Sequence, residues 1–470
     1  MANKTAPKPV QRRGPAPEKT VEIDSATAAL IFFGIALVYF LPALMPGRHI
    51  YGSDYIEAGY MMYEFARERI VSGSLPKWVP YILGGLPMFA NPGSVFYPLR
   101  LLTNFLLPGT MSLPIIFIFQ FGIAGFGMYL LARELGCRTW AAFIAGIAFQ
   151  LTGITISAVY AGHDGRVIVA TFAPLFLFFL HRGIRTGSFA AFAGAATTLG
   201  FSLLSFQIQS NYYVLLAGAA WATFLLVHLG IIRTPRALAT RTALGLGAVA
   251  FAFAIAAVNF LPFRDYVADS PRGAARGYTY STTWSLPPAE LVGMAVPEHV
   301  GVFDAYKGKN PFKINTEYVG AFVLVLLVLG FAVSRRNRYW WFFLGVMAVT
   351  LTIAMGGHTP IYRLYYEILP GTKRFRAPSV SFFLIALSLA AMAALTLERI
   401  AQMYDERKGT GKGRDIVSWL LAAIAGTVIA VSVIASVTQG FGGSPGAATG
   451  FGRFAIFAVL LCLAMWLWWS

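Results

Sequence analysis

The stretch 47–100 contains the first residues of this chain that could perform chemistry. It follows the first strongly apolar segment directly, and Asp54 lies near its start, two residues beyond Gly52. A carboxylate at a low-dielectric boundary can be poised to take a proton from an attacking hydroxyl. In the sequence GSDYIEAGY, the same residue could instead cap the helix that follows or be a surface acid. The spacing therefore predicts either a site at a membrane surface or a structural cap over a helix bundle.

A second group of ionisable residues lies in the sequence AGHDGR, between two apolar segments. It consists of His163, Asp164 and Arg166. Charges at a membrane boundary are costly, so such residues are candidates for ligand binding. A tight turn also favours Gly and Asp, and an ordinary polar turn is the alternative interpretation.

The long connector 263–316 offers a third group. It includes Arg272, Glu298 and His299 among several aromatic residues. Arginine and aromatic side chains beside acids suit a carbohydrate or phosphate site. The alternative is a folded loop with surface charges.

A fourth group is basic and lies in the sequence PGTKRFRAPS, residues 370–379. Arg374 and Arg376 are expected on the side of the membrane that usually carries few basic residues. Basic groups there favour an anionic lipid headgroup or a phosphate as their ligand. The alternative is that the side chains reach from a helix end to the interface without binding anything. Of the two, we favour the anion.

The composition is that of a membrane protein. Hydrophobic residues make up 57% of the 470 residues and charged residues only 12%, about half the charged fraction of a soluble chain. The net charge of +17 resides mainly in short connectors between apolar segments. That placement is typical of the basic cytoplasmic connectors of membrane proteins, and it argues against nucleic-acid binding.

Missing motifs exclude several other chemistries. The two cysteines, Cys137 and Cys462, do not form a CxxC, and no HExxH or clustered His and Cys spacing is present. Neither a structural disulfide nor a zinc site is therefore indicated. The sequence also lacks GxxxxGK[ST], DxD and a GxGxxG that follows a strand. We expect no nucleotide-dependent site, and an activated group would have to arrive through the membrane.

Apolar segments of about 20 residues, the length that spans a bilayer, recur along the chain. Twelve segments qualify: 26–46, 111–132, 139–160, 166–181, 188–207, 210–230, 241–262, 317–334, 339–355, 377–397, 416–437 and 451–469. The run 95–107 is shorter and contains Pro98 and Arg100, which favours a re-entrant or interfacial segment.

The charges of the connectors predict how the chain is oriented. If the N-terminus is cytoplasmic, every cytoplasmic connector is basic, and the opposite connectors are nearly balanced in charge. The long opposite connectors are 47–110, 263–316 and 356–376. We therefore expect a multi-pass protein of the cytoplasmic membrane whose candidate chemical residues lie on the outer side.

Several segments, taken together and in order, resemble the YfhO-like bacterial membrane proteins, which belong with the GT-C-type glycosyltransferases. The matching segments are GSDY…LGGLPMF…YPL (52–99), AGHDGRVIVATFAPL (161–175), SPRGAARGYTYSTTWSLPPAELVGMAVPEHVG (270–301), EYVG (317–320) and PGTKRFRAPSVSFFL (370–384). The resemblance implies an all-α polytopic fold, a GT-C-like bundle of about twelve transmembrane helices with interfacial helices in the first outer loop. Composition, apolar length and charge predict a disordered cytoplasmic tail (1–25), the core (26–397), a cytoplasmic linker (398–415) and a C-terminal transmembrane hairpin (416–470).

The resemblance also implies roles for particular residues. An acid at the start of the first outer loop serves such enzymes as the catalytic base, and Asp54 matches that position. Asp164 and Glu298 match acids that assist or bind metal, and Arg374 and Arg376 match arginines that hold the donor phosphate. The donor would be a polyprenyl-phosphate sugar, and whether a divalent metal takes part is left open.

We therefore predict an inverting glycosyltransferase that moves a sugar from a polyprenyl-phosphate carrier to a polymer or protein of the cell envelope. Asp54 would be catalytic, and the binding residues would be His163, Asp164, Arg166, Arg272, Glu298, His299, Arg374 and Arg376. Membrane lipids would be its other partners. The alternatives are a transporter or flippase of lipid-linked sugars, which needs no base, and a non-catalytic membrane subunit of a larger assembly.

Overall fold

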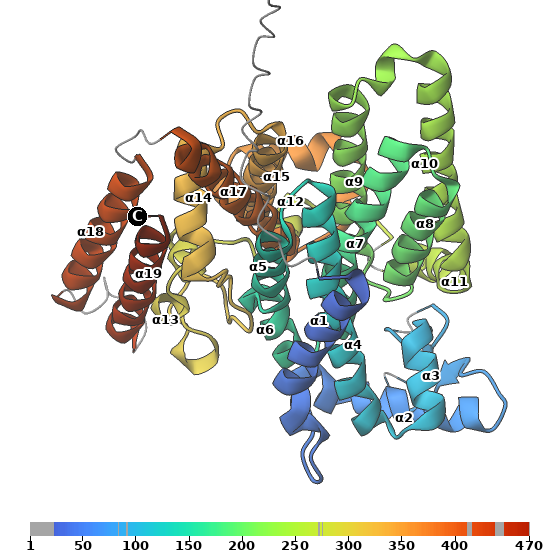
Figure 1. Ribbon diagram of the computed structural model, residues 1–470. Coiled ribbons are helices and arrows are strands. Elements are labelled where there is room, and N and C mark those ends of the chain that lie inside the picture. Colours follow the sequence, from blue (N-terminus) through green and yellow to red (C-terminus); the bar gives the residue numbers. More distant parts are fainter. Residues whose placement is uncertain are drawn as a thin grey trace, which may run out of the picture.

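The computed structural model describes residues 23–82, 84–90, 93–270, 273–274, 276–410, 416–437 and 446–469. Most of the expected tail 1–25, part of the expected linker and Arg272 lie outside these residues. Within the described ranges, the only strands are β1 (Trp78–Val79) and β2 (Leu86–Pro87), which pair antiparallel. The remaining regular structure is helical (Figure 1), and the predicted all-α fold is confirmed.

All twelve predicted spans are helices. Nine stretches of helix in the described residues are long and apolar enough to cross a membrane, and shorter apolar helices occupy the other three positions. The helices are α1 (Ser25–Phe40), α4 (Gly109–Glu134), α5 (Thr139–Gln150) continued by α6 (Gly153–Ala161), α7 (Asp164–Thr186), α8 (Phe189–Leu203), α9 (Ile208–His228), α10 (Pro235–Ile255), α14 (Ala321–Val333), α15 (Arg338–Met355), α17 (Phe383–Thr410), α18 (Ile416–Val437) and α19 (Ala447–Trp469).

Short helices fill the three long connectors, which all lie at one end of the bundle, here called the loop end. The first connector holds η2 (Tyr55–Gly59), α2 (Tyr60–Val71) and α3 (Pro98–Leu106). Helix α11 (Ala257–Ala268) leads into the second, which holds α12 (Tyr278–Ser281), η4 (Pro288–Met294), α13 (Pro297–Val300) and η5 (Phe303–Ala305). The third holds η6 (Gly356–His358), α16 (Ile361–Ile368), η7 (Thr372–Arg374) and η8 (Pro378–Phe382). The remaining short helices are η1 (Leu41–Leu44) and η3 (Ile231–Arg233).

The core forms around α4, α5, α7 and α17. In an apolar stretch of 18 residues within Pro378–Glu406, which includes most of α17, 94% of the residues are buried, against 11% in the corresponding stretch of α10. Helix α17 is therefore central, and α10 faces the surroundings of the bundle. Small residues allow close packing near α1, because a Cβ at Gly125 or Gly146 would lie 2.4 Å from the ring of Phe32.

Helix α17 continues through most of the predicted linker, which differs from the expectation of a linker from residue 398. Polar contacts hold its extension: Gln402 donates to Glu398, and Arg138 Nη2 lies 2.6 Å from Asp405. A helix can run beyond the bilayer when its last turns are held by such pairs. Helices α18 and α19 pack on each other and against α13 and α14, at one side of the molecule (Figure 1).

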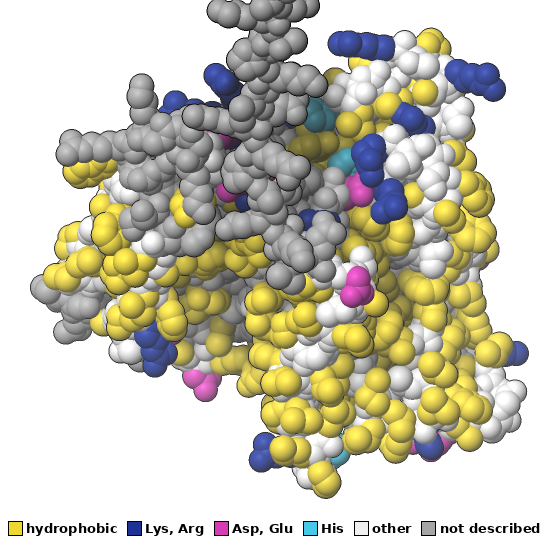
Figure 2. Space-filling view, in the orientation of Figure 1, with side chains coloured by type: hydrophobic (Ala, Val, Ile, Leu, Met, Phe, Trp, Pro, Cys, Tyr) yellow, Lys and Arg dark blue, Asp and Glu magenta, His cyan; other side chains and the backbone are white. Residues whose placement is uncertain are grey.

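The surface agrees with a membrane-spanning bundle. Figure 2 shows hydrophobic side chains over most of the visible face, with Lys and Arg gathered mainly toward its upper end. The connector between α9 and α10 contributes Arg233 and Arg236 to the end opposite the loop end. This distribution matches the predicted cytoplasmic position of these connectors, and the sidedness itself stays a prediction.

Candidate functional site

Asp54 and His163 meet at the loop end, although the first comes from the start of the first connector and the second from the turn before α7. Asp54 Oδ2 lies 3.3 Å from His163 Nε2. The Asp54 side chain is 53% exposed, and that of His163 is 19% exposed. Asp54 accepts no capping hydrogen bond from the helix η2 that follows it, which removes the capping interpretation. The structure thus presents an accessible carboxylate beside an imidazole.

The electrostatics keep this carboxylate ionised. A hydrogen bond from His163 is the largest cause that lowers the pKa of Asp54, and Ser53 and Arg166 contribute. Burial, followed by the charge of Arg166, lowers the pKa of His163 below its usual 6.5. At neutral pH the imidazole is therefore largely uncharged, and it lies 3.3 Å from the carboxylate, within hydrogen-bonding distance.

Two glycines allow the contact. Gly162 has φ of +86°, and a Cβ on it would lie 2.7 Å from the Cβ of Asp54. A Cβ on Gly52 would lie 3.1 Å from the nitrogen of Gly162. The backbone of the first connector therefore lies directly against the turn before α7, which only glycine permits at both positions. Ser53 Oγ adds a hydrogen bond of 3.2 Å to the carbonyl of Ala161.

Arginine side chains border the pair. Arg166, in the first turn of α7, is partly exposed and interacts electrostatically with both Asp54 and Arg376. The backbone of Arg376 is held by α9, because Gln209 Nε2 donates to its carbonyl at 2.7 Å. The Arg376 guanidinium carbon lies 5.9 Å from the ring centre of Tyr280. Gln209 lies in the turn SFQIQSNYY, whose amides the sequence suggested could hydrogen-bond a sugar or satisfy the turn backbone. Tyr280 was outside the predicted site, and its only sequence signal was its place in a polar connector.

Asp164 lies next to His163 but faces the interior, in place of the ligand-binding role expected for it. Its carboxylate accepts hydrogen bonds from Arg100 Nη2 at 2.7 Å, from the Tyr63 hydroxyl at 2.9 Å and from Ser94 Oγ. Arg100 is fully buried and its guanidinium lies 4.0 Å from the ring centre of Tyr63. Burial raises the pKa of Tyr63, so its hydroxyl stays a donor. Asp164 therefore fastens the first connector to α7.

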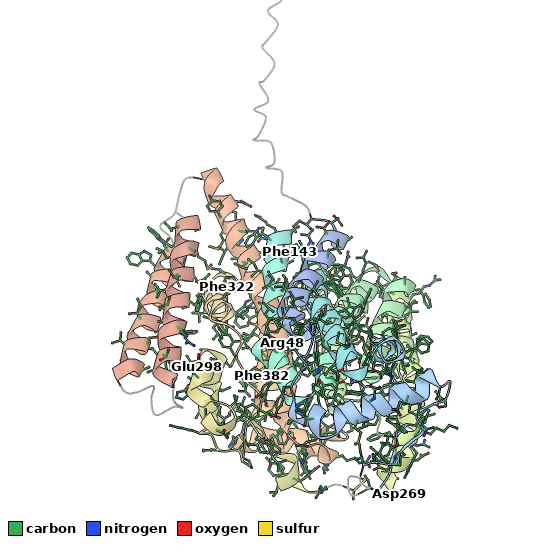
Figure 3. All side chains as sticks on the ribbon, turned by 90° about the horizontal axis from the view of Figure 1, so that it is seen from below. Arg48, Phe143, Asp269, Glu298, Phe322 and Phe382 are labelled. Carbon is green, nitrogen blue, oxygen red and sulfur yellow. The ribbon has the colours of Figure 1, made fainter. Side chains whose placement is uncertain are left out.

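Glu298 and His299 belong to another part of the loop end, which corrects their expected place in the site. Glu298 Oε1 lies 3.3 Å from Arg453 Nη1 of α19, and the His299 ring packs on Phe451. Figure 3 shows Glu298 beside the red helices α18 and α19, away from the blue α2. Because α13 carries both residues toward α19, they do not join Asp54. Arg374 is exposed in η7, two residues before Arg376.

The donor set around Asp54 does not fit a resident metal ion. Among the described residues, no group of three or more His, Cys, Asp or Glu side chains could hold one. Asp54 and His163 supply two donors, and Arg166 beside them would repel a cation. The site is therefore described without a metal.

An apolar groove of about 470 Å³ runs between α9 and α15. Its walls reach from Trp341 to Tyr365, Leu369 and Ser381, close in sequence to the 370–376 loop. Helix α9 contributes Tyr213 at this end, one turn after Gln209. A hydrocarbon chain in this groove would thus lie near the loop that holds Arg376.

The fold and site define a helical membrane protein with an accessible acid and arginines at one end of its bundle. The chain belongs to the family described as "6-pyruvoyl-tetrahydropterin synthase related domain; membrane protein", whose model matches residues 96–439. A comparison with curated proteins finds none that matches. Membership of the YfhO-like proteins stays a prediction.

Two solved structures are similar to the chain at low sequence identity. Arabinofuranosyltransferase AftD from Mycobacteria is 15% identical with a TM-score of 0.49, over 80% of this chain and 25% of that one. ArnT from Cupriavidus metallidurans, bound to undecaprenyl phosphate, is 12% identical with a TM-score of 0.41, over 93% of this chain and 76% of that one. The chain thus spans only a quarter of the length of AftD.

Proposed function

We propose that the protein is a membrane glycosyltransferase that moves a sugar from a polyprenyl-phosphate carrier to an acceptor hydroxyl at the loop end. The observation that carries the proposal is the accessible Asp54 carboxylate, held by His163, within the electrostatic range of Arg166. Arg166 is in turn within range of Arg376. An acid and cations contributed by separate segments thus border one region of the surface.

The reaction needs a base and a cationic group, and these residues supply both. The acceptor O–H bond breaks as its proton passes to Asp54, and the acceptor oxygen attacks the anomeric carbon of the sugar. The bond from that carbon to the phosphate oxygen breaks, and the phosphate leaves with the electron pair. Arg166 and Arg376 stabilise the negative charge on the departing phosphate. A single displacement of this kind inverts the anomeric centre.

The apolar groove supports a lipid-borne donor. A polyprenyl chain is a hydrocarbon, and the groove between α9 and α15 offers about 470 Å³ with almost entirely apolar walls. The groove ends near the loop that carries Arg374 and Arg376. A chain bound there would bring its phosphate toward the arginines. The basic connectors at the opposite end favour an orientation in the cytoplasmic membrane with the loop end outside, where an envelope polymer or protein would be the acceptor.

The test is transfer by the purified protein in lipid nanodiscs with a polyprenyl-phosphate sugar as donor. We expect Asp54→Asn to lower the transfer rate by about 10²–10⁴-fold with donor binding retained, because the amide cannot take the proton. Asp265→Asn is the matched control, since this exposed acid pairs with its neighbour Arg264. Asp265→Asn should keep full transfer.

Full transfer by Asp54→Asn would overturn the role of Asp54. Movement of the lipid-linked sugar across the bilayer, without transfer and unaffected by Asp54→Asn, would favour a transporter instead. A protein that neither transfers nor moves the donor would favour a non-catalytic subunit.

A further inference from the structure

A small cavity lies on the other side of α9 from the apolar groove. It occupies about 140 Å³ between the start of α9 and the junction of α10 and α11. Phe375, which lies between the two arginines of the 370–376 loop, also lines it. The lining residues are Leu203, Phe206, Ile208, Asn211, Tyr212, Leu215, Phe253, Ala256, Asn259, Phe260 and Phe375.

Asn259 is the unusual residue of this lining. It is 1% exposed, and neither its Nδ2 nor its Oδ1 has a hydrogen-bond partner among the described residues. Burying an amide without partners costs stability, so such a group is rarely kept without a reason. Asn259 lies in the apolar first half of α11, where a leucine would bury no unpaired polar group.

Asn211 provides an internal comparison, because it lines the same cavity and is equally buried. Its Oδ1 accepts from Ser202 Oγ at 2.7 Å, and its Nδ2 donates to the carbonyl of Ser202 at 3.1 Å. Asn211 is therefore explained by the link that it makes between α8 and α9. No such link explains Asn259.

The other residues of the cavity are mainly aromatic and aliphatic. The Tyr212 and Phe375 rings lie 5.2 Å apart, and the Phe253 and Phe260 rings 5.4 Å apart. The Tyr212 hydroxyl is also buried without a partner among the described residues. A cavity of roughly 150 Å³ can bind a benzene-sized group, so this volume suits a short apolar segment.

We propose that this cavity binds an amphiphile from the bilayer. An alkyl segment packs on the aromatic rings, and an adjoining hydroxyl or amide group both donates to Asn259 Oδ1 and accepts from its Nδ2. The bilayer is the source because α10, which forms one wall, is the least covered of the long apolar helices. The site goes beyond the proposed transfer, since it lies apart from the donor groove across α9. The amphiphile is either the acceptor of the sugar or a bulk lipid.

Photolabelling of the purified protein in nanodiscs tests the site. The probes are a long-chain primary alcohol that carries a diazirine and the matched diazirine alkane without the hydroxyl. We expect the alcohol to label the cavity peptides several-fold more than the alkane. Asn259→Leu should remove this difference, because leucine keeps the branched shape of asparagine and loses both hydrogen bonds.

A substitution that fills the cavity with a larger side chain gives a second measurement. Ala256→Phe should lower labelling by both probes, whereas Leu246→Phe on the exposed face of the adjoining helix α10 should lower neither. Asn259→Leu adds much less volume than Ala256→Phe, so it keeps the test valid if Ala256→Phe does not fold. Equal labelling by the two probes in the wild-type protein, or an alcohol preference that survives Asn259→Leu, would overturn the proposal.

Transfer kinetics separate the two sources of the amphiphile. If the acceptor occupies the cavity, Asn259→Leu raises the acceptor KM several-fold and leaves the donor KM unchanged. If a bulk lipid occupies it, the alcohol preference is lost while both KM values stay unchanged. Failure of the proposed transfer would appear instead as the absence of sugar transfer by the wild-type protein, which the labelling results do not depend on.

Discussion

Two side-chain pairs join the first connector to the start of α7, and they differ in nearly every physical respect. Asp54 and His163 meet at the surface at 3.3 Å, with the carboxylate half exposed. Arg100 and Asp164 meet in the interior at 2.7 Å, with the guanidinium fully buried. The two α7-side residues are neighbours in sequence, so the contrast arises within one turn of the chain.

The difference shows how a membrane protein can hold an acid in an accessible place. Three donors, from Tyr63, Ser94 and Arg100, surround Asp164 and leave little of it for a ligand. Asp54 is bound by His163, with Ser53 nearby at 3.4 Å, and keeps an open face. The buried pair holds the first connector against α7, and this keeps the exposed pair at the surface, where a ligand can reach it. Substitutions in the two pairs should therefore affect different quantities.

Removing the buried guanidinium should have the largest effect on stability. Arg100→Leu leaves Asp164 as an uncompensated buried charge, and we expect the free energy of unfolding to fall by about 3–5 kcal/mol. Unfolding by SDS in mixed micelles measures this change. Arg67→Leu is the control, because Arg67 pairs with Glu64 at the surface, where a pair contributes only about 0–1 kcal/mol. Similar losses in both variants would show that the Arg100–Asp164 pair does not fasten the connector.

A substitution at the Gly162 contact should have the next largest effect. It separates the effect of backbone strain from the effect of moving Asp54. Gly162→Ala and Gly136→Ala both place a side chain at positive φ, +86° and +90°, at a cost of about 1–2 kcal/mol each. Only at Gly162 does the new Cβ collide with Asp54, since nothing lies within 4 Å at Gly136. If the collision moves the Asp54 carboxylate by about 1 Å, the transfer rate can fall by about 10²-fold. We expect only Gly162→Ala to lose transfer, and equal transfer in the two variants would contradict the positioning role.

Much of the fold could be predicted from the sequence. A segment that spans a bilayer must be apolar over about 20 residues, and the cytoplasmic connectors between such segments are basic. All twelve spans were found, and so were both partners of the exposed pair. Their contact was not predictable, because it depends on a close backbone approach at Gly52 and Gly162.

Three residues show what the sequence did not reveal about position. Asp164 was grouped with His163 because they are adjacent, although neighbours at a helix start point about 100° apart. Glu298 shared a connector with other candidates, but the short helix α13 directs it to α19. Asn259 was a single polar residue within a predicted span, and its missing partners are visible only in three dimensions.

The hydrogen bond from His163 should have a smaller effect, confined to acid pH. Because it lowers the pKa of Asp54, the carboxylate stays ionised until the pH falls through that lowered value. In His163→Ala the pKa should rise toward its ordinary 3.8, so the acid limb of the transfer rate should move to higher pH while the rate at pH 7 changes less. His163→Gln retains an N–H donor and should keep the wild-type limb. A limb that is unmoved in His163→Ala would show that this hydrogen bond does not govern the ionisation of Asp54.

The smallest effect is expected at Glu298, which lies outside both pairs. Its contact with Arg453 joins α13 to α19 near the surface, where removing one charge costs about 0–1 kcal/mol. Glu298→Gln keeps the size of the side chain, so we expect transfer and donor KM to stay at the wild-type level, in contrast to Asp54→Asn. A loss of transfer without a loss of stability would mean that α13 moves toward Asp54 when substrate binds. The site would then include residues from both sides of the loop end. The exposed Asp54–His163 pair and the buried Arg100–Asp164 pair would no longer be enough to describe it.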